Sequence, residues 1–424
     1  MIIKIRILII TSLLNIFLNI LTQAQFTHSN FDVTVVSYIN FKDGLNRLAI
    51  GFIENFSNKL KINFIPTYSN INIKDIPSTI KSIINNQNET PGNVALLFDP
   101  LFKNNIKFIP NSYIKIAYSM IESTQLPEEW VDILNKEFDA VLVPAPFLKK
   151  VYKKSGVNIP IFLLPCGIYI DDLLSVPIKD KKNTPFVFGC SATFLPRKNQ
   201  EILLNAFLNK FGNNKNIKLK LHGRYGDIKL INKLKKIIRE KKAKNVELIL
   251  GPLEQKNYVN FLNSLDCYVL VSKGEGFSIT PRESISLGIP TIISNNTAHK
   301  ELAQTPFFIP LKSKIKEPAD YRWLFGKYCG YNFNIMQKDL EQVLEEVYNN
   351  YEHYLKKSQL GREWVKQYRY NNLEQKYINI IKPKKIIFGN NNIITDDYVM
   401  TSSEKLFEKY KNIIMYVKKI DKII

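Results

Sequence analysis

The sequence predicts an α/β protein made of two parallel-sheet domains. Short apolar runs, typical of buried strands, alternate along the chain with stretches of helical periodicity. The alternation is interrupted by a polar segment with proline and lysine at residues 175–185, and then starts again. A length of 424 residues suits two or three domains. We therefore expect two α/β domains that join at about residue 180.

The first domain begins with an apolar strand at residues 31–39, a loop at 40–44 that ends in Gly44, and a helix at 45–56. Further apolar runs predict strands at residues 61–66, 93–99, 113–119, 140–145 and 160–165. Residues 128–138 carry apolar side chains at helical spacing. This order predicts a Rossmann-like domain with a parallel sheet.

The second domain repeats the order of strand and helix. Strands are predicted at residues 184–192, 217–223, 246–251, 266–272 and 290–294, and helices at 199–211, 227–241, 255–265 and 281–288. Neither first strand is followed by a GxGxxG pattern, so a dehydrogenase-type dinucleotide site has no support.

Both ends of the chain carry segments outside these domains. Residues 1–25 place Lys4 and Arg6 before an apolar run, as in a signal peptide or membrane anchor. An additional helix or strand, or a start codon placed too early, would account for the same pattern. We assign residues 26–178 to the N-terminal domain, 179–365 to the C-terminal domain, and 366–424 to a crossover helix and a basic amphipathic tail. The last helix either docks on the protein or rests on a membrane surface.

The chain is strongly basic, with 59 Lys and Arg, 38 Asp and Glu, and a formal net charge of +21. Such a surplus usually indicates nucleic acid or an anionic membrane as partner. However, Ile, Lys and Asn, which AT-rich codons favour, are abundant, and the lysines lie mainly on predicted helix exteriors. With no recognisable nucleic-acid-binding module, we expect no nucleic-acid partner. The four cysteines are far apart and form no metal-type spacing.

The most informative segment is SKGEGFSITPRESISLGIPTI, residues 272–292. It places Glu275 in a glycine-rich loop after a strand and Glu283 on the next helix, with seven residues between them. Ligands of parallel sheets bind at the carboxyl ends of the strands, where amides at a helix start can receive an anion. Gly274 and Gly276 allow the backbone to approach a ligand closely. The pattern suits a sugar nucleotide, with carboxylates for hydroxyls and amides for the diphosphate.

On these residues the chain resembles the family 4 glycosyltransferases of the GT-B fold, which carry a Glu-x7-Glu motif followed by a Gly-Ile-Pro stretch. The resemblance covers about residues 113–380. It implies that Glu275 contacts the donor sugar and that Glu283 binds the nucleotide ribose. It also implies that the loop residues line the sugar and phosphates: Gly276, Phe277, Ser278, Ile279 and Thr280. Most members have Gly where this chain has Ser278, and Ala where it has Ser284.

A second match is SATFLPRKNQEILLNAF, residues 191–207. Lys198 aligns with the family lysine that neutralises the donor diphosphate. The partner arginine of the family usually lies about five residues earlier, where this chain has Thr193, so Arg197 is the candidate substitute. The chain has no DxD triplet, which agrees with a metal-independent enzyme. A solvated basic patch at a helix start is the alternative interpretation of Arg197 and Lys198.

In the first domain, residues 116–157 resemble the acceptor-domain segment of bacterial family 4 members, including Glu122. Gly44 lies in the first strand-to-helix loop, which in this fold faces the donor phosphates and acceptor. Many members have a histidine near the reacting sugar, whereas this chain offers His28 only, upstream of the first strand. Glu122 is the candidate replacement, although a buried or helix-capping glutamate would look the same in the sequence.

We therefore expect a retaining, metal-independent hexosyltransferase that needs no cofactor, with Glu275, Lys198 and Glu122 as catalytic residues. The donor is a nucleotide diphosphate sugar, and the acceptor a hydroxyl of a glycan, polysaccharide or lipid-linked sugar, with peripheral membrane contact. The donor places the enzyme in the cytoplasm or on the cytoplasmic face of the membrane, whereas residues 1–25 resemble an export signal. The alternatives are another GT-B enzyme, such as a sugar-nucleotide epimerase or a phosphorylase, and a non-catalytic protein that binds polyanions or membranes.

Overall fold

The computed structural model describes residues 29–38, 44–68, 78–85, 90–112, 114–382, 387–388 and 393–394. The predicted signal or anchor segment, His28, the loop before Gly44 and the predicted last helix lie outside the described residues. Within the described part, no helix is long and apolar enough to cross a membrane.

The first domain contains a parallel sheet of six strands in the order β2-β1-β3-β4-β5-β6. Every residue of β1, β3 and β5 is buried, as expected for strands covered by helices on both faces. The strands are β1 Val33–Ser37, β2 Ile62–Pro66, β3 Val94–Leu97, β4 Ile114–Tyr118, β5 Ala140–Val143 and β6 Ile161–Leu163. The helices are α2 Gly44–Phe56, α3 Ser78–Asn85, α4 Lys103–Ile106, α5 Glu128–Glu137, α6 Pro146–Lys154 and α7 Asp171–Ser175.

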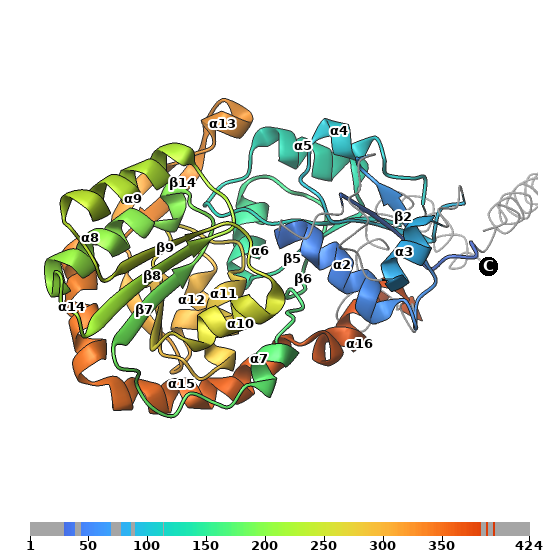
Figure 1. Ribbon diagram of the computed structural model, residues 1–424. Helices are drawn as coiled ribbons and strands as arrows, with labels where there is room; N and C mark the ends of the chain where they lie inside the picture. Colours follow the sequence, from blue (N-terminus) through green and yellow to red (C-terminus); the bar gives the residue numbers. More distant parts are fainter. Residues whose placement is uncertain are drawn as a thin grey trace, which may run out of the picture.

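The second domain has a parallel sheet of the same size, in the order β12-β11-β10-β7-β8-β9. Figure 1 shows the two sheets side by side, the first domain in blue and teal and the second in green and yellow. The strands are β7 Phe186–Ser191, β8 Ile217–Gly223, β9 Val246–Leu250, β10 Cys267–Leu270, β11 Thr291–Asn295 and β12 Ile309–Lys312. The helical segments are η2 Pro196–Lys198, α8 Gln200–Phe211, α9 Ile228–Glu240, α10 Gln255–Asn263, α11 Ile279–Ser286 and α12 His299–Ala303.

The lysine-rich helix α9 illustrates why the sequence pattern predicts these elements well. Leu230 and Leu234, four residues apart, are buried on one face, while Lys235 and Lys236 are exposed. The prediction that the lysines of this helix face outward is confirmed, so this part of the positive charge belongs to a solvated surface.

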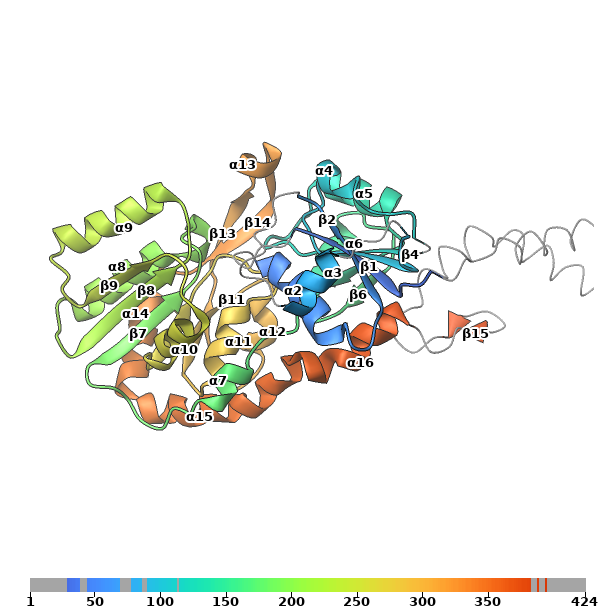
Figure 2. The ribbon, with the colours of Figure 1, turned by 45° about the vertical axis from the view of Figure 1, so that its right-hand side comes forward.

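An antiparallel hairpin that the sequence analysis did not predict follows β12. It consists of β13 Ile315–Asp320, the short helix α13 Arg322–Phe325 and β14 Tyr328–Asn334, and we call it the arm. The arm rises beside the first domain (Figure 2). Its buried residues Ala319, Tyr321 and Cys329 belong to one apolar cluster with residues of the first domain. The Phe325 ring packs edge-on against Trp130 of α5, with ring centroids 5.6 Å apart.

The C-terminal helices cross from the second domain back to the first. They are α14 Gln337–Asn349, α15 Tyr351–Val365, the turn η3 Lys366–Tyr368 and α16 Tyr370–Ile381. α15 lies along the second domain and α16 against the first (Figures 1 and 2). The Tyr377 hydroxyl donates to the Pro165 carbonyl at 2.9 Å. Gly51 and Gly167 leave room for the Tyr370 ring, because a Cβ at either position would overlap it. Beyond α16, strands β15 Ile387–Phe388 and β16 Ile393–Ile394 pair with each other.

Candidate active site

The turn after β7 carries Arg197 and Lys198. The turn is fixed by Asn199, whose φ of 61° lies in the left-handed region that asparagine tolerates. The Asn199 side-chain amide donates to the Val271 carbonyl and to Asn334 Oδ1, both at 2.8 Å. The turn is therefore tied to the end of β10 and to the arm, and its two cations lie at the carboxyl edge of the second sheet.

Both cations meet Glu275, the first carboxylate of the motif. Lys198 Nζ lies 2.6 Å and Arg197 Nη1 3.3 Å from Glu275 Oε1, and the glutamate is 5% exposed. Burial alone would raise the pKa of Glu275, but Lys198 and Arg197 outweigh it and lower that pKa to about 2. Glu275 is therefore ionised at neutral pH. The position of Arg197 in the sequence differs from that of the family arginine. In the structure its guanidinium contacts the same carboxylate as Lys198.

Glu122 reaches this group from the first domain. Its Oε1 lies 3.0 Å from Arg197 Nη2, and its Oε2 accepts from the Tyr321 hydroxyl of the arm at 2.9 Å. Gly274 permits this closeness, because a Cβ at that position would overlap the carbonyl oxygen of Glu122. The structure therefore brings the three predicted catalytic residues into one network of two cations and two carboxylates.

Glu283, the second carboxylate of the motif, lies on α11 and is 2% exposed. It accepts a hydrogen bond from the Tyr258 hydroxyl of α10 at 2.6 Å. Burial and the Glu283 charge raise the pKa of Tyr258 well above its ordinary value. Glu283 is thus a buried, hydrogen-bonded carboxylate and not a solvated helix residue.

Two arginines near Glu283 were not singled out in the sequence. Arg224 follows β8, and Arg47 lies on α2 of the first domain. Burial lowers the pKa of Arg224, and the nearby charge of Arg47 lowers it further, while Tyr258 and Glu283 act in the opposite direction. Each domain therefore contributes one arginine to the surroundings of Tyr258 and Glu283.

The loop residues between the two carboxylates differ in where their side chains lie. Gly276 packs against the Met120 side chain, which a Cβ would meet at 3.0 Å. Phe277 is 2% exposed and its side chain belongs to the apolar core, and its place in the donor site stays a prediction. Ser278, Ile279 and Thr280 are half-buried, and the Thr280 hydroxyl accepts from the Tyr268 hydroxyl at 2.6 Å. Gly44 is the first residue of α2.

His299 forms a hydrogen bond with the side chain of Ser278 in this loop. Its Nδ1 lies 3.1 Å from the Ser294 carbonyl, an acceptor, so Nδ1 carries the proton. The unprotonated Nε2 then accepts from the Ser278 hydroxyl at 2.8 Å. Burial lowers the pKa of His299 to about 4, although the Glu275 charge acts in the opposite direction. The imidazole is therefore neutral at physiological pH.

These shifts predict acid destabilisation in two pH ranges. The folded pKa of His299 is depressed from 6.5 to about 4, so the unfolded chain binds this proton first, and the free energy of unfolding falls from pH 6.5 to 4. Glu275, depressed from 4.5 to about 2, extends the loss below pH 4.5. Denaturant unfolding at stepped pH values measures both. His299→Gln is expected to make the free energy of unfolding depend less on pH between 6.5 and 4, whereas His353→Gln, at an exposed residue, leaves this dependence unchanged. Equal slopes in both variants contradict the assignment to His299.

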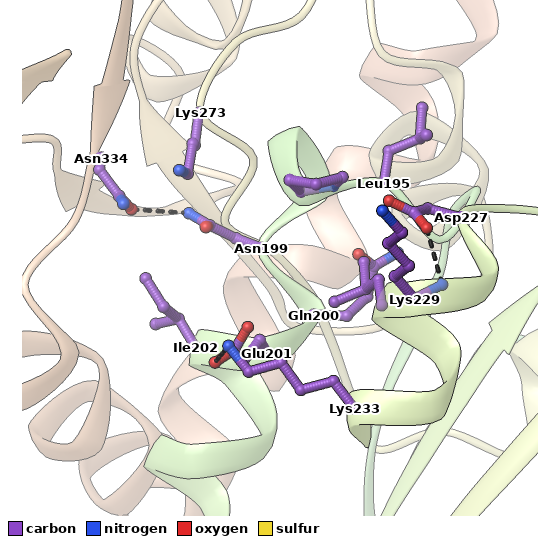
Figure 3. A pocket seen from close by; sticks show the side chains of 12 residues that line it. Leu195, Asn199, Gln200, Glu201, Ile202, Asp227, Lys229, Lys233, Lys273 and Asn334 are labelled. Carbon is purple, nitrogen blue, oxygen red and sulfur yellow. Dashed lines mark hydrogen bonds and ion pairs between the residues drawn. The ribbon is translucent and has the colours of Figure 1, made fainter. Parts of the chain in front are cut away.

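A cavity of about 410 Å³ borders the site on the other side of the turn (Figure 3). It lies between the starts of α8 and α9 and the arm, and its charged side chains include Lys229, Lys273 and Asp227. Its lining includes none of the residues predicted to bind the donor. Among the described residues, no group of three or more His, Cys, Asp and Glu side chains is placed to hold a metal ion.

The partners of the motif residues were missed in the sequence for a simple reason. Tyr258 lies 25 residues before its partner Glu283. Tyr321 lies 199 residues after its partner Glu122. Neither tyrosine belongs to a recognisable pattern, and only the folded arrangement of α10 and of the arm brings them to their carboxylates.

Residues 175–306 match the family model described as "Glycosyl transferases group 1". An uncharacterized glycosyltransferase of Methanocaldococcus jannaschii is 31% identical over 144 residues, which cover 34% of this chain and 32% of that protein. The chain thus matches about a third of the length of this curated relative.

Several solved structures resemble the fold of this chain. Sucrose-phosphate synthase of Thermosynechococcus elongatus has a TM-score of 0.61 at 12% identity and covers 82% of this chain and 97% of its own. The match to Anabaena HepE in complex with UDP-glucose has a TM-score of 0.59 at 11% identity. It spans 82% of this chain and 98% of the HepE chain. The match to TarM has a TM-score of 0.54 at 13% identity. It spans 68% of this chain and 54%, about half, of the TarM chain. The chain therefore has the GT-B fold, and its second domain carries the group 1 glycosyl transferase segment.

Proposed function

We propose that the chain is a retaining family 4 glycosyltransferase that moves a hexose from a nucleotide diphosphate donor to an acceptor hydroxyl. The observation that carries this proposal is the contact of the half-buried Lys198 and Arg197 with the buried Glu275 at the carboxyl edge of the second sheet. It lies within the segment that matches the group 1 glycosyl transferase model. HepE, a protein of the same fold, is described in complex with UDP and with UDP-glucose.

In this proposal Lys198 and Arg197 hold the diphosphate of the donor. The lysine has three N–H donors and the arginine has five, so each side chain can keep its contact with Glu275 while it also binds phosphate oxygens. As the glycosidic bond to the phosphate breaks, negative charge grows on the leaving diphosphate, and fixed cations in a dry cleft stabilise it. Arg47 and Arg224 add further positive charge near Glu283.

The two motif carboxylates then orient the donor. Glu275 accepts hydrogen bonds from hydroxyls of the transferred sugar, because it is ionised and rigidly held. Glu283, held by Tyr258, accepts from the ribose hydroxyls. The acceptor hydroxyl attacks from the face of the leaving group and passes its proton to the leaving phosphate, so the configuration at the anomeric carbon is retained. Glu122 lies where the first domain meets the cations and, in this proposal, contacts the reacting sugar or acceptor.

The acceptor is proposed to be a glycan, a polysaccharide or a lipid-linked sugar. The formal charge of +21 exceeds what the cations of the site require, and a basic surface suits peripheral contact with an anionic membrane that carries lipid-linked acceptors.

The proposal is tested by incubation with a panel of labelled nucleotide sugars, with UDP-glucose first, and glycan and lipid-linked acceptors. A new glycoside whose anomeric configuration equals that of the donor is the expected product. Epimerised donor or free sugar phosphate supports the other GT-B enzymes instead. Salt-sensitive retention on a polyanion or on anionic vesicles, without turnover of any donor, supports the non-catalytic alternative.

We also propose that transfer needs no divalent metal. The cations of Lys198 and Arg197 then take the role that a metal ion has in other phosphate-binding sites. Removing divalent ions with EDTA is expected to change the transfer rate less than about twofold, because neither proposed diphosphate ligand depends on a metal. A loss of activity that added Mg²⁺ or Mn²⁺ restores contradicts this.

A further inference from the structure

The donor loop, residues 274–280, contains a backbone conformation that needs support. Ser278, immediately before α11, has φ 73° and ψ 87°. This is the left-handed region, which is unfavourable for a residue with a Cβ atom. Such a conformation persists only where neighbouring groups hold it. The loop therefore depends on whatever fixes the two peptide groups beside Ser278.

Arg282, one turn further along α11, supplies that support. Its side chain is fully buried, with 0% exposed. Its Nη1 donates to the carbonyl oxygens of Phe277 at 2.6 Å and of Ser278 at 2.9 Å. These two carbonyls belong to the peptide planes on either side of the Ser278 Cα. A single nitrogen bonded to both therefore restrains φ and ψ of Ser278 together.

The guanidinium of Arg282 itself contacts two aromatic rings. Its Cζ lies 3.7 Å from the Phe277 ring centroid and 4.5 Å from that of Tyr368. Stacking on ring faces suits the planar arginine group and is unavailable to lysine in the same form. Nη2 lies 3.8 Å from Glu301 Oε2, while Nε and Nη2 have no hydrogen-bond partner among the described residues. Stacking and the two carbonyls thus define the position of this side chain.

Tyr368 connects Arg282 to the place where the chain crosses between the domains. It lies in η3, between α15 and α16. Its carbonyl accepts from the Ile168 N–H at 2.9 Å, and its hydroxyl donates to Glu301 Oε1 at 3.0 Å. The ring that packs on Arg282 therefore belongs to the segment that joins the second domain to the first.

We propose that Arg282 is a positioning residue that holds the donor loop in its left-handed conformation at Ser278 and ties that loop to the crossing segment at Tyr368. The inference rests on the proposed function only in taking residues 274–280 as a donor-binding loop. Arg282 acts through the backbone carbonyls of the loop. Its removal leaves Glu275, Glu283 and Lys198 in the sequence but releases the segment that separates the two carboxylates.

The first test needs no ligand. Backbone hydrogen exchange of a peptide spanning residues 275–280 is compared in the full chain and in Arg282→Met, with Arg282→Lys as the second variant should the first not fold. Both are expected to raise exchange in this peptide about tenfold, because local opening becomes easier. Arg362→Met is the matched control. Arg362 donates to the Ser286, Leu174 and Val176 carbonyls away from the loop, so its loss leaves exchange at 275–280 unchanged.

The second test uses the strain at Ser278. Glycine adopts positive φ without the Cβ penalty, so a loop with Ser278→Gly depends less on Arg282. The tenfold effect of Arg282→Met is expected to shrink to less than about threefold in the Ser278→Gly background. A merely structural role would lower the thermal midpoint equally in both backgrounds. Unchanged exchange in the Arg282 variants overturns the proposal, and so does an Arg282→Met effect of equal size in the wild-type and Ser278→Gly backgrounds.

Calorimetric titration with UDP separates this inference from the proposed function. Arg282→Met is expected to weaken UDP binding about tenfold, and the weakening to be smaller in the Ser278→Gly background. If the wild-type chain binds none of UDP, GDP, ADP and TDP, the proposed function fails, while the exchange experiment still decides whether Arg282 holds the loop. If UDP binds equally to wild type and Arg282→Met, the positioning role is wrong.

Discussion

Replacement of Glu275 by glutamine is expected to lower the transfer rate by about 100-fold or more, an effect of the size seen when one electrostatic contact in an active site is removed. Glutamine has nearly the same shape but no charge. It leaves Lys198 and Arg197 without the carboxylate that they share, and it gives the sugar hydroxyls a weaker acceptor. Steady-state rates of glycoside formation, together with the thermal midpoint of each protein, measure the effect.

Glu317→Gln is the matched control for Glu275→Gln. Glu317, on β13 of the arm, forms an ion pair at 2.5 Å with Lys273, which lies two residues before Glu275 in the sequence. It has no place in the proposed donor site, so a rate within about twofold of wild type is expected, as for most substitutions of partly exposed residues. Wild-type activity in Glu275→Gln would remove that residue from the site.

Lys198→Met is expected to reduce kcat by about 100-fold or more, with a smaller change in KM. Methionine keeps most of the length and the apolar stem of lysine but not the cation. The charge on the departing diphosphate is larger in the transition state than in the bound donor, so the lost cation affects the chemical step most. Initial rates over a range of donor concentrations separate kcat from KM.

Lys233→Met provides the comparison for Lys198→Met. Lys233 also forms an ion pair, with Glu201 at 2.7 Å, but its side chain is 57% exposed and lies on α9. Exposed pairs of this kind contribute little, so its kinetics are expected to match those of the wild type. An equal loss in both variants would show that positive charge in general, and not the position of Lys198, supports the reaction.

The fold was predictable because buried parallel strands leave a strong apolar signal. The apolar runs at residues 184–192 and 266–272 predicted β7 and β10 to within two residues at each end. The arm was missed because its strands carry little such signal. β13 contains Pro318 and has the sequence IKEPAD, β14 contains Gly330, and the buried Ala319 and Cys329 of this hairpin pack with residues of the first domain.

The candidate site was predictable where local spacing defines it. Glu275 and Glu283 belong to one strand-loop-helix segment, and Lys198 to one turn, so the sequence pattern carried their positions. The role of Arg282 depends on Tyr368, which is 86 positions away and reaches it only through the crossing helices. The family resemblance assigned Phe277 to the donor loop, and the structure shows in addition that its ring packs against Arg282. No spacing rule distinguishes these two uses of an aromatic side chain.

Through the arm and α16, the stability of each domain depends on the other domain. The arm places Ala319, Tyr321 and Cys329 in an apolar cluster of the first domain, and α16 packs its tyrosines against α2 from the opposite end of the chain. Unfolding of either domain alone would expose these apolar surfaces and strip the other domain of its cover. We therefore expect scanning calorimetry to record one cooperative heat-absorption peak instead of two. A chain built in this way denatures as a single unit although it folds into two sheets.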